Sequence, residues 1–149
     1  RAAYYVGMTG LTPEERFEVF GDFSPDDYAE EAEQRWGGTD AYIESARRTS
    51  GYTKADWQRF KAKSEDWGRR LVEAMDAGLP ADSVQAMELA EEHRQQISQW
   101  FYECTYEIHT GLADMYLADD RFTQFYEKIK PGMAQYLHDA IHANAVSRA

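Results

Sequence analysis

The single cysteine of this 149-residue chain, Cys104, is the side chain whose type allows the widest range of chemistry. One cysteine excludes both an internal disulfide and a cysteine-rich zinc site. A lone thiol can be a small apolar side chain in the core, a nucleophile, or a reactive group in the wall of a ligand cavity. Cys104 falls on the apolar stripe of a helical pattern, which favours a buried structural thiol and leaves a thiol lining a cavity as the alternative.

Histidine is the usual base that deprotonates a catalytic cysteine, and the chain has four histidines. Within one continuous helix, His109 would lie about 140° around the axis from Cys104, and His93 would lie about 16 Å away along the axis. Only a neighbour brought in by the tertiary fold, such as His138 or His142, could then form a catalytic pair with the thiol.

The charge around Cys104 also opposes catalysis. Glu103 precedes the cysteine and Glu107 lies about one helical turn further on. Nearby carboxylates raise the pKa of a thiol, whereas catalytic cysteines have a lowered pKa. We therefore expect no enzymatic activity, with a Cys–His hydrolase or transferase as the less favoured alternative.

Motifs for metals and cofactors are missing from the sequence. A di-iron carboxylate bundle requires Glu-x-x-His pairs, but no histidine here has glutamate three positions before it. The residues at those positions are Ala90, Tyr106, Gln135 and Asp139. The chain also lacks an HExxH zinc motif, a P-loop and a glycine-rich dinucleotide turn, so we expect no metal and no cofactor.

Aromatic side chains crowd around the cysteine. Tyr102, Tyr106 and His109 form a row at helical spacing, and Trp100 and Phe101 stand just before it. Tyrosine and tryptophan combine a large apolar body with one polar group, which suits a cleft for a large, flat, heteroaromatic ligand.

The elements that position these residues are predicted to be helices. Valine and isoleucine together number 10, whereas alanine and glutamate number 35, so strand-forming residues are scarce and helix formers abundant. Proline, glycine and capping residues divide the chain into segments. The expected helices cover about 12–21, 24–36, 39–51, 53–76, 82–118 with a break near 101–105, 119–130, and 131–146.

An apolar stripe marks the helix predicted over residues 53–76, and it indicates a core-facing surface. One of its two tryptophans could line a cleft instead. The stripe consists of Trp57, Phe60, Trp67, Leu71 and Ala74.

The first third of the chain differs from the rest. Residues 1–51 carry a net charge of −6 and contain short predicted helices with several aromatic side chains. Helices of this length are marginal by themselves, so they depend on packing against another surface. We expect either a lid that closes over a ligand or three small helices that are permanently docked.

Charge and hydropathy exclude further classes of protein. The net charge of −11 and the pI near 4.7 exclude direct recognition of nucleic acid, which depends on clustered basic side chains. No apolar run approaches the roughly 20 residues of a membrane span, and no signal segment opens the chain. We expect one soluble, cytoplasmic domain.

Four motifs in order carry a resemblance to the TipA-type antibiotic-recognition domain. They are Phe20-Gly21-Asp22-Phe23-Ser24-Pro25-Asp26, Arg35-Trp36-Gly37-Gly38-Thr39-Asp40-Ala41-Tyr42, Tyr52-Thr53-Lys54-Ala55-Asp56-Trp57, and Tyr102-Glu103-Cys104-Thr105-Tyr106-Glu107-Ile108-His109-Thr110. The resemblance covers residues 11–146. This family forms the C-terminal sensor half of MerR-type transcription activators and also occurs as the sensor alone.

The resemblance implies a fold and a domain organisation. The fold would be a globin-like helical bundle with short N-terminal lid helices. A body over residues 53–146 and a lid over 11–51 would together make one antibiotic-binding domain, residues 11–149. Residues 1–10 would be linker or residues introduced for expression. The isolated domain is expected to be monomeric and to reach DNA only through an N-terminal domain missing from this sequence.

The resemblance also implies a ligand. Macrocyclic thiopeptides such as thiostrepton would bind in the aromatic cleft. The thiol of Cys104 would add to a dehydroalanine tail of the antibiotic. The domain would thereby sense or sequester the drug and contribute to drug resistance. The other expected contacts are Trp36, Tyr42, Trp57, Phe101, Tyr102, Tyr106 and His109. The alternatives are a non-covalent sensor of another large hydrophobic ligand, and an adaptor that binds only proteins.

Overall fold

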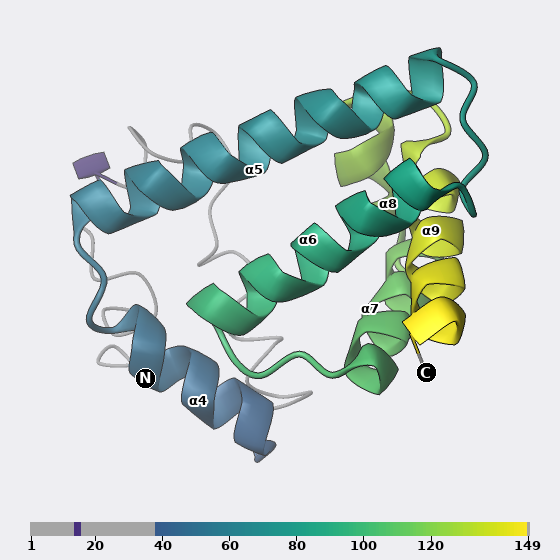
Figure 1. Ribbon diagram of the computed structural model, residues 1–149. Coiled ribbons are helices and arrows are strands. Elements are labelled where there is room, and N and C mark those ends of the chain that lie inside the picture. The colour runs from purple at the N-terminus through teal and green to yellow at the C-terminus, as the bar shows by residue number, and fades with distance from the viewer. Residues whose placement is uncertain (1–13, 16–37, 149) are drawn as a thin grey trace. The chain divides into compact units, whose positions relative to one another are not determined.

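The computed structural model describes residues 14–15 and 38–148, and every regular element in those ranges is helical (Figure 1). The complete helices are α4 (Asp40–Thr49), α5 (Lys54–Asp76), α6 (Val84–Trp100), α7 (Tyr106–Ala118), α8 (Asp120–Glu127) and α9 (Met133–Arg148). The predicted helices over 12–21 and 24–36 lie outside the described residues except at 14–15, which are helical.

Within the described ranges, no helix combines the length and the apolar character that crossing a lipid bilayer requires.

Capping side chains begin the helices where the sequence indicates. The Oγ1 atom of Thr39 accepts a hydrogen bond of 3.2 Å from the backbone N–H of Tyr42 at the start of α4. Thr53 and Asp56 cap α5 reciprocally, because each side chain accepts from the backbone N–H of the other. Such caps satisfy N–H groups that have no partner inside the helix.

Two glycines with positive φ set helix boundaries. Gly78, at φ 72°, follows the end of α5, and Gly132, at φ 91°, precedes α9. The sequence predicts that Pro131 starts the last helix, but α9 begins at Met133 because Gly132 has left-handed backbone geometry. The carboxylate of Glu127 accepts the N–H groups of Gly132 and Ala134 and so caps this helix.

The break expected near residues 101–105 is confirmed. Helix α6 ends at Trp100 and α7 begins at Tyr106. Thr105 is the N-cap of α7, with its Oγ1 accepting from the N–H of Ile108 at 3.1 Å. The hydroxyl of Thr105 therefore caps the start of the next helix.

The chain divides into two compact units. Among the described residues, the first comprises 14–15, 38–64 and Ile97–Glu103, and the second comprises Glu65–Gln96 and 104–148. In the first unit, the guanidinium of Arg48 on α4 donates to the carbonyl of Ser98, at 2.7 Å. The hydroxyl of Tyr52 donates to the carbonyl of Trp100, at 2.6 Å. These bonds attach α4 and the turn after it to the last turn of α6.

The second unit contains the larger apolar core. Helices α7 and α9 lie side by side along much of their length (Figure 1). The indole N–H of Trp67 donates to the carbonyl of Leu89, which joins α5 to α6. The largest fully buried apolar side chains are Leu71, Met133, Leu137 and Ile141. Burial of each such side chain contributes about 1.5–3 kcal/mol, so this core accounts for much of the stability of the unit.

Candidate functional site

Cys104 lies in the non-helical segment between α6 and α7 and is fully buried. Its backbone carbonyl accepts a 2.8 Å hydrogen bond from the guanidinium of Arg94. Its Sγ is 3.8 Å from the carbonyl oxygen of Thr105, a weak S–H donor contact. The expected burial of the thiol is confirmed, and Cys104 lies within the expected break near residues 101–105, so it is not on the face of a helix.

Burial raises the pKa of the Cys104 thiol to about 11. The positive charge of Arg94 lowers the pKa, and the negative charge of Glu91 raises it further. The sequence predicts a raised pKa from Glu103 and Glu107, but both are exposed, and burial is the main cause. A thiol in this state is a weak nucleophile at neutral pH.

A buried carboxylate, Glu91 on α6, organises the polar groups of the second unit. Its oxygens accept hydrogen bonds from Arg94 at 2.6 Å, Asn144 at 3.0 Å and Tyr106 at 3.3 Å. Burial alone would raise the pKa of Glu91, but these donors and the charge of Arg94 outweigh it and lower the pKa to about 2. The network joins α6, α7 and α9.

Tyr106, a predicted ligand contact, belongs to this network. Its ring lies under the guanidinium of Arg94, with Cζ of the arginine 4.2 Å from the ring centroid. Its hydroxyl donates to Glu91, and its side chain is half-buried. The cation–π contact and the hydrogen bond hold the ring in one orientation.

His109, another predicted contact, is fully buried and pairs with His93. The Nε2 atom of His109 and the Nδ1 atom of His93 are 2.8 Å apart, and the two rings stack with their centroids 5.1 Å apart. Burial lowers the pKa of His93 to about 4 and that of His109 to about 3. Both imidazoles are therefore neutral near pH 7. A continuous helix would have kept these histidines apart from one another.

The environment of Nδ1 in His109 bears on which nitrogen of the imidazole carries the proton. Its Nδ1 is buried and has no hydrogen-bond partner among the described residues. An unpaired N–H at this position would be costly, which favours the tautomer that carries its proton on Nε2 and donates it to His93.

An aromatic cluster dominates the first unit. Trp57 is 4% exposed and contacts Tyr52, Phe60 and Phe101, with ring centroids 5.4 to 6.3 Å apart. Phe60 also contacts Trp100 edge-on at 5.4 Å. The core-facing stripe predicted for α5 is confirmed at Trp57, and Phe101 is half-buried beside it.

The remaining predicted contacts are less enclosed. Tyr42 is half-buried on α4, and Tyr102 is half-buried just after α6, where its N–H donates to the carbonyl of Ile97. Trp36 and most of the predicted lid lie outside the described residues. The roles of these side chains in ligand binding stay predictions.

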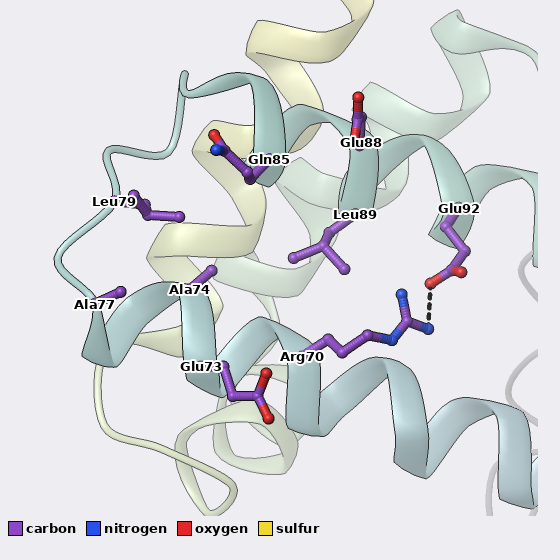
Figure 2. Close-up of a pocket in the computed structure, with 9 residues that line it drawn as sticks. All are labelled: Arg70, Glu73, Ala74, Ala77, Leu79, Gln85, Glu88, Leu89 and Glu92. Carbon is purple, nitrogen blue, oxygen red and sulfur yellow. Dashed lines mark ion pairs between the residues drawn. The ribbon is translucent and has the colours of Figure 1, made fainter.

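A pocket of about 470 Å³ lies between the end of α5 and the start of α6 (Figure 2). Its wall includes three glutamates, Glu73, Glu88 and Glu92, and the guanidinium of Arg70, which pairs with Glu92 at 2.8 Å. In the part of the chain that the structure describes, no aromatic side chain and no predicted ligand contact lines it. Its chemistry does not fit the cleft expected for a large aromatic ligand.

Comparison with known proteins places these residues in a family. The family model described as the TipAS antibiotic-recognition domain matches residues 28–144. The chain belongs to the TipAS antibiotic-recognition domain family. The resemblance inferred from the four sequence motifs is thereby confirmed.

Curated relatives of this TipAS-family chain are transcription regulators. The chain is 57% identical to the transcriptional activator TipA of Streptomyces coelicolor over 91% of its length, which is 54% of that relative. It is 34% identical to the transcriptional activator mta of Bacillus subtilis over 76% of its length and 43% of the relative. The chain thus spans about half the length of these proteins.

Solved structures of the family match the fold. TipAS of Streptomyces lividans, in complex with nosiheptide, aligns with a TM-score of 0.88 and 55% identity, covering 95% of this chain and 99% of that one. An antibiotic-binding domain of a TipA-class multidrug resistance regulator aligns with a TM-score of 0.58 and 50% identity, covering 62% and 99%. The expected all-α, globin-like fold is confirmed.

Sequence reasoning missed the buried polar interior of the second unit. The Glu91–Arg94 spacing is a visible signal for a helical ion pair, but it predicts a solvated pair. The partner Asn144 lies 53 residues away from Glu91, and no local pattern connects them.

Proposed function

We propose that this chain is the antibiotic-binding half of a MerR-type transcription activator and that its ligands are thiopeptides such as nosiheptide. The close match over nearly the whole chain to the solved complex of TipAS with nosiheptide carries this proposal. The DNA-binding half would lie in the part of the relatives that this chain does not span. As the sensor of a transcription regulator, the domain would act in the cytoplasm.

We propose that the ligand is recognised mainly by aromatic side chains. Phe101 and Tyr102 in the first unit and Tyr106 in the second are half-buried, so each exposes part of an aromatic ring that a thiazole-rich macrocycle could contact. Trp57 in the first unit and His109 in the second are enclosed, so we assign each a supporting role within its own unit. Tyr42, and Trp36 outside the described residues, would be further contacts.

Trp100 offers a polar anchor in the same region of the sequence. Its indole Nε1 is buried and lacks a hydrogen-bond partner among the residues that the structure describes. A buried N–H without an acceptor is costly. A carbonyl or ring nitrogen of the antibiotic would remove this cost, which would favour the bound state.

The covalent step would be a conjugate addition by Cys104. The thiolate sulfur attacks the terminal CH₂ of a dehydroalanine in the antibiotic, forming a C–S bond as the C=C bond breaks. The electron pair moves to the α-carbon, which takes up a proton, so nothing leaves and the adduct has the summed mass. Each domain reacts once and does not turn over. A weak nucleophile is sufficient for this single reaction because the bound antibiotic is held with its electrophilic carbon beside the sulfur.

Intact mass spectrometry with nosiheptide tests the function. The wild-type chain should gain the mass of one nosiheptide, and Cys104→Ala should gain none. Quenching of tryptophan fluorescence should show that Cys104→Ala keeps its reversible affinity within about tenfold, because the aromatic contacts remain.

The adduct mass tests the covalent step, and the fluorescence quenching tests thiopeptide binding. Tight quenching without any adduct in the wild type would contradict the covalent step and favour a non-covalent sensor. Absence of both signals would contradict thiopeptide binding itself. Turnover of a chromogenic ester that Cys104→Ala abolishes would instead identify an enzyme.

A further inference from the structure

Three metal-ligating side chains meet where α7 lies against α9. His138 and His142 are one turn apart on α9, and Asp114 projects from α7. The Oδ1 atom of Asp114 is 3.0 Å from Nε2 of His138 and 2.8 Å from Nε2 of His142. All three donor atoms lie within 4.8 Å of one another.

A fourth residue orients one of the imidazoles. Nδ1 of His138 is 2.9 Å from a carboxylate oxygen of Asp139, so the ring is held at one nitrogen while its Nε2 points toward Asp114. A carboxylate behind a ligating histidine is the usual outer partner of protein metal sites, because it fixes both the tautomer and the ring. An ordinary ion pair on the surface does not require a second carboxylate that orients the histidine.

The donor set indicates which metal fits. Two imidazole nitrogens and one carboxylate oxygen suit Zn²⁺, whereas Ca²⁺ and Mg²⁺ require shells made mostly of oxygen. In a tetrahedral zinc site with bonds of about 2.0–2.1 Å, neighbouring donors lie about 3.3 Å apart. The distances from Asp114 to the two imidazole nitrogens, 3.0 and 2.8 Å, are within about 0.5 Å of that value.

The exposure of the three side chains determines the fourth position. His138 is 22% exposed, His142 39% and Asp114 63%, so one side of the cluster faces solvent. A water molecule or a ligand group can therefore complete the shell.

We propose that Asp114, His138 and His142 form a binding site for one Zn²⁺ ion that ties α7 to α9, with Asp139 as the outer partner of His138. None of the residues proposed to bind the antibiotic belongs to it. The site therefore gives the domain a second ligand, a divalent transition metal, whose binding stabilises the packed pair of helices.

Competition with a chromophoric zinc chelator tests the site on the full 149-residue chain without a histidine tag. The wild type should bind one Zn²⁺ per chain, with Mg²⁺ unable to compete. Asp114→Asn, His138→Gln and His142→Gln should each weaken binding at least tenfold, and Asp139→Asn should weaken it less. Asp82→Asn, which changes an exposed aspartate on another part of the unit, serves as the control and should leave the affinity unchanged.

The absorption spectrum of bound Co²⁺ is a second test of the site, and it uses the wild type alone. Co²⁺ bound to the wild type should show the intense visible absorption of a four-coordinate site with nitrogen and oxygen donors. The melting temperature of the wild type should rise with zinc, and that of His142→Gln should not. Failure of the wild type to compete with the chelator, or equal affinity in His142→Gln and the wild type, would overturn the proposal.

Discussion

At the residue scale, Cys104 combines a reactive atom with an environment that restrains it. Its side chain is fully buried and the pKa of its thiol is about 11. A group in this state neither oxidises readily nor reacts with passing electrophiles. Selectivity for an antibiotic then follows from the need to hold the electrophile beside the sulfur.

The pH dependence of adduct formation measures this restraint. With a pKa of about 11, only about one thiol in ten thousand is ionised at pH 7, and each pH unit raises the thiolate tenfold. The rate with saturating nosiheptide should therefore rise about tenfold per unit from pH 7 through pH 9, followed by mass spectrometry. A small free thiol should level off near its pKa of about 8.5. A plateau for the protein below pH 9 would contradict the burial of the thiol.

Glu91 is the residue on which the buried polar network depends. Glu91→Gln keeps the shape of the side chain but leaves the Arg94 guanidinium without its charged partner. The free energy of unfolding at pH 7 should fall by about 3 kcal/mol, as for other broken buried pairs. Urea denaturation measures the loss, and Glu88→Gln, an exposed change on the same helix, should be nearly neutral.

The sign of the pH effect follows from the shift at Glu91. Its pKa is lowered from 4.5 to about 2 in the folded chain, so the stabilisation is complete above pH 4.5 and is lost as the pH falls toward 2. The difference between the wild type and Glu91→Gln should therefore shrink between pH 4.5 and pH 2. An equal difference at pH 7 and pH 2.5 would show that packing, and not charge, is what the substitution removes.

At the element scale, two glycines with opposite conformational demands lie in the middle of α5 and just after its end. Gly68 lies inside the helix and is buried, yet a Cβ added there meets no atom of the described residues within 4 Å. Gly78 has φ 72°, which side chains rarely adopt. Gly68→Ala should raise the free energy of unfolding by about 0.5–1 kcal/mol, since alanine is the better helix former.

The matched substitution at the other glycine should act in the opposite direction. Gly78→Ala should lower the free energy of unfolding by about 1–2 kcal/mol, because L-residues pay that cost in the left-handed region. Thermal or urea unfolding of both variants checks the pair. Destabilisation by Gly68→Ala would indicate that the helix surface at Gly68 is closed by a part of the chain that the structure does not describe.

At the scale of the whole molecule, the net charge of −11 determines how the chain meets nucleic acid. Phosphate backbones bind proteins through released counterions and clustered lysine or arginine, and an acidic domain repels them. The isolated chain should show no measurable affinity for duplex DNA at physiological salt in a fluorescence anisotropy titration. Specific binding would contradict its assignment as the sensor half of an activator.

The sequence by itself determined the family and, within residues 38–148, the helices. Capping residues such as Thr39 and Thr53, and glycines such as Gly78, act over three or four residues, so helix boundaries can be predicted from local patterns. The error at Pro131 arose because a neighbouring glycine overrode a good helix-starting residue. The family emerged from motifs in a fixed order, which need no knowledge of packing.

Only the tertiary structure decided which polar groups meet. His93 and His109 pair because α6 ends and the chain reverses before α7, and no periodicity predicts that reversal in detail. Asn144 reaches Glu91 across 53 residues, and Asp114 reaches His142 across 28. Contacts of this kind depend on how whole helices pack, because the free energy that brings them together comes from the apolar core and not from the polar residues themselves.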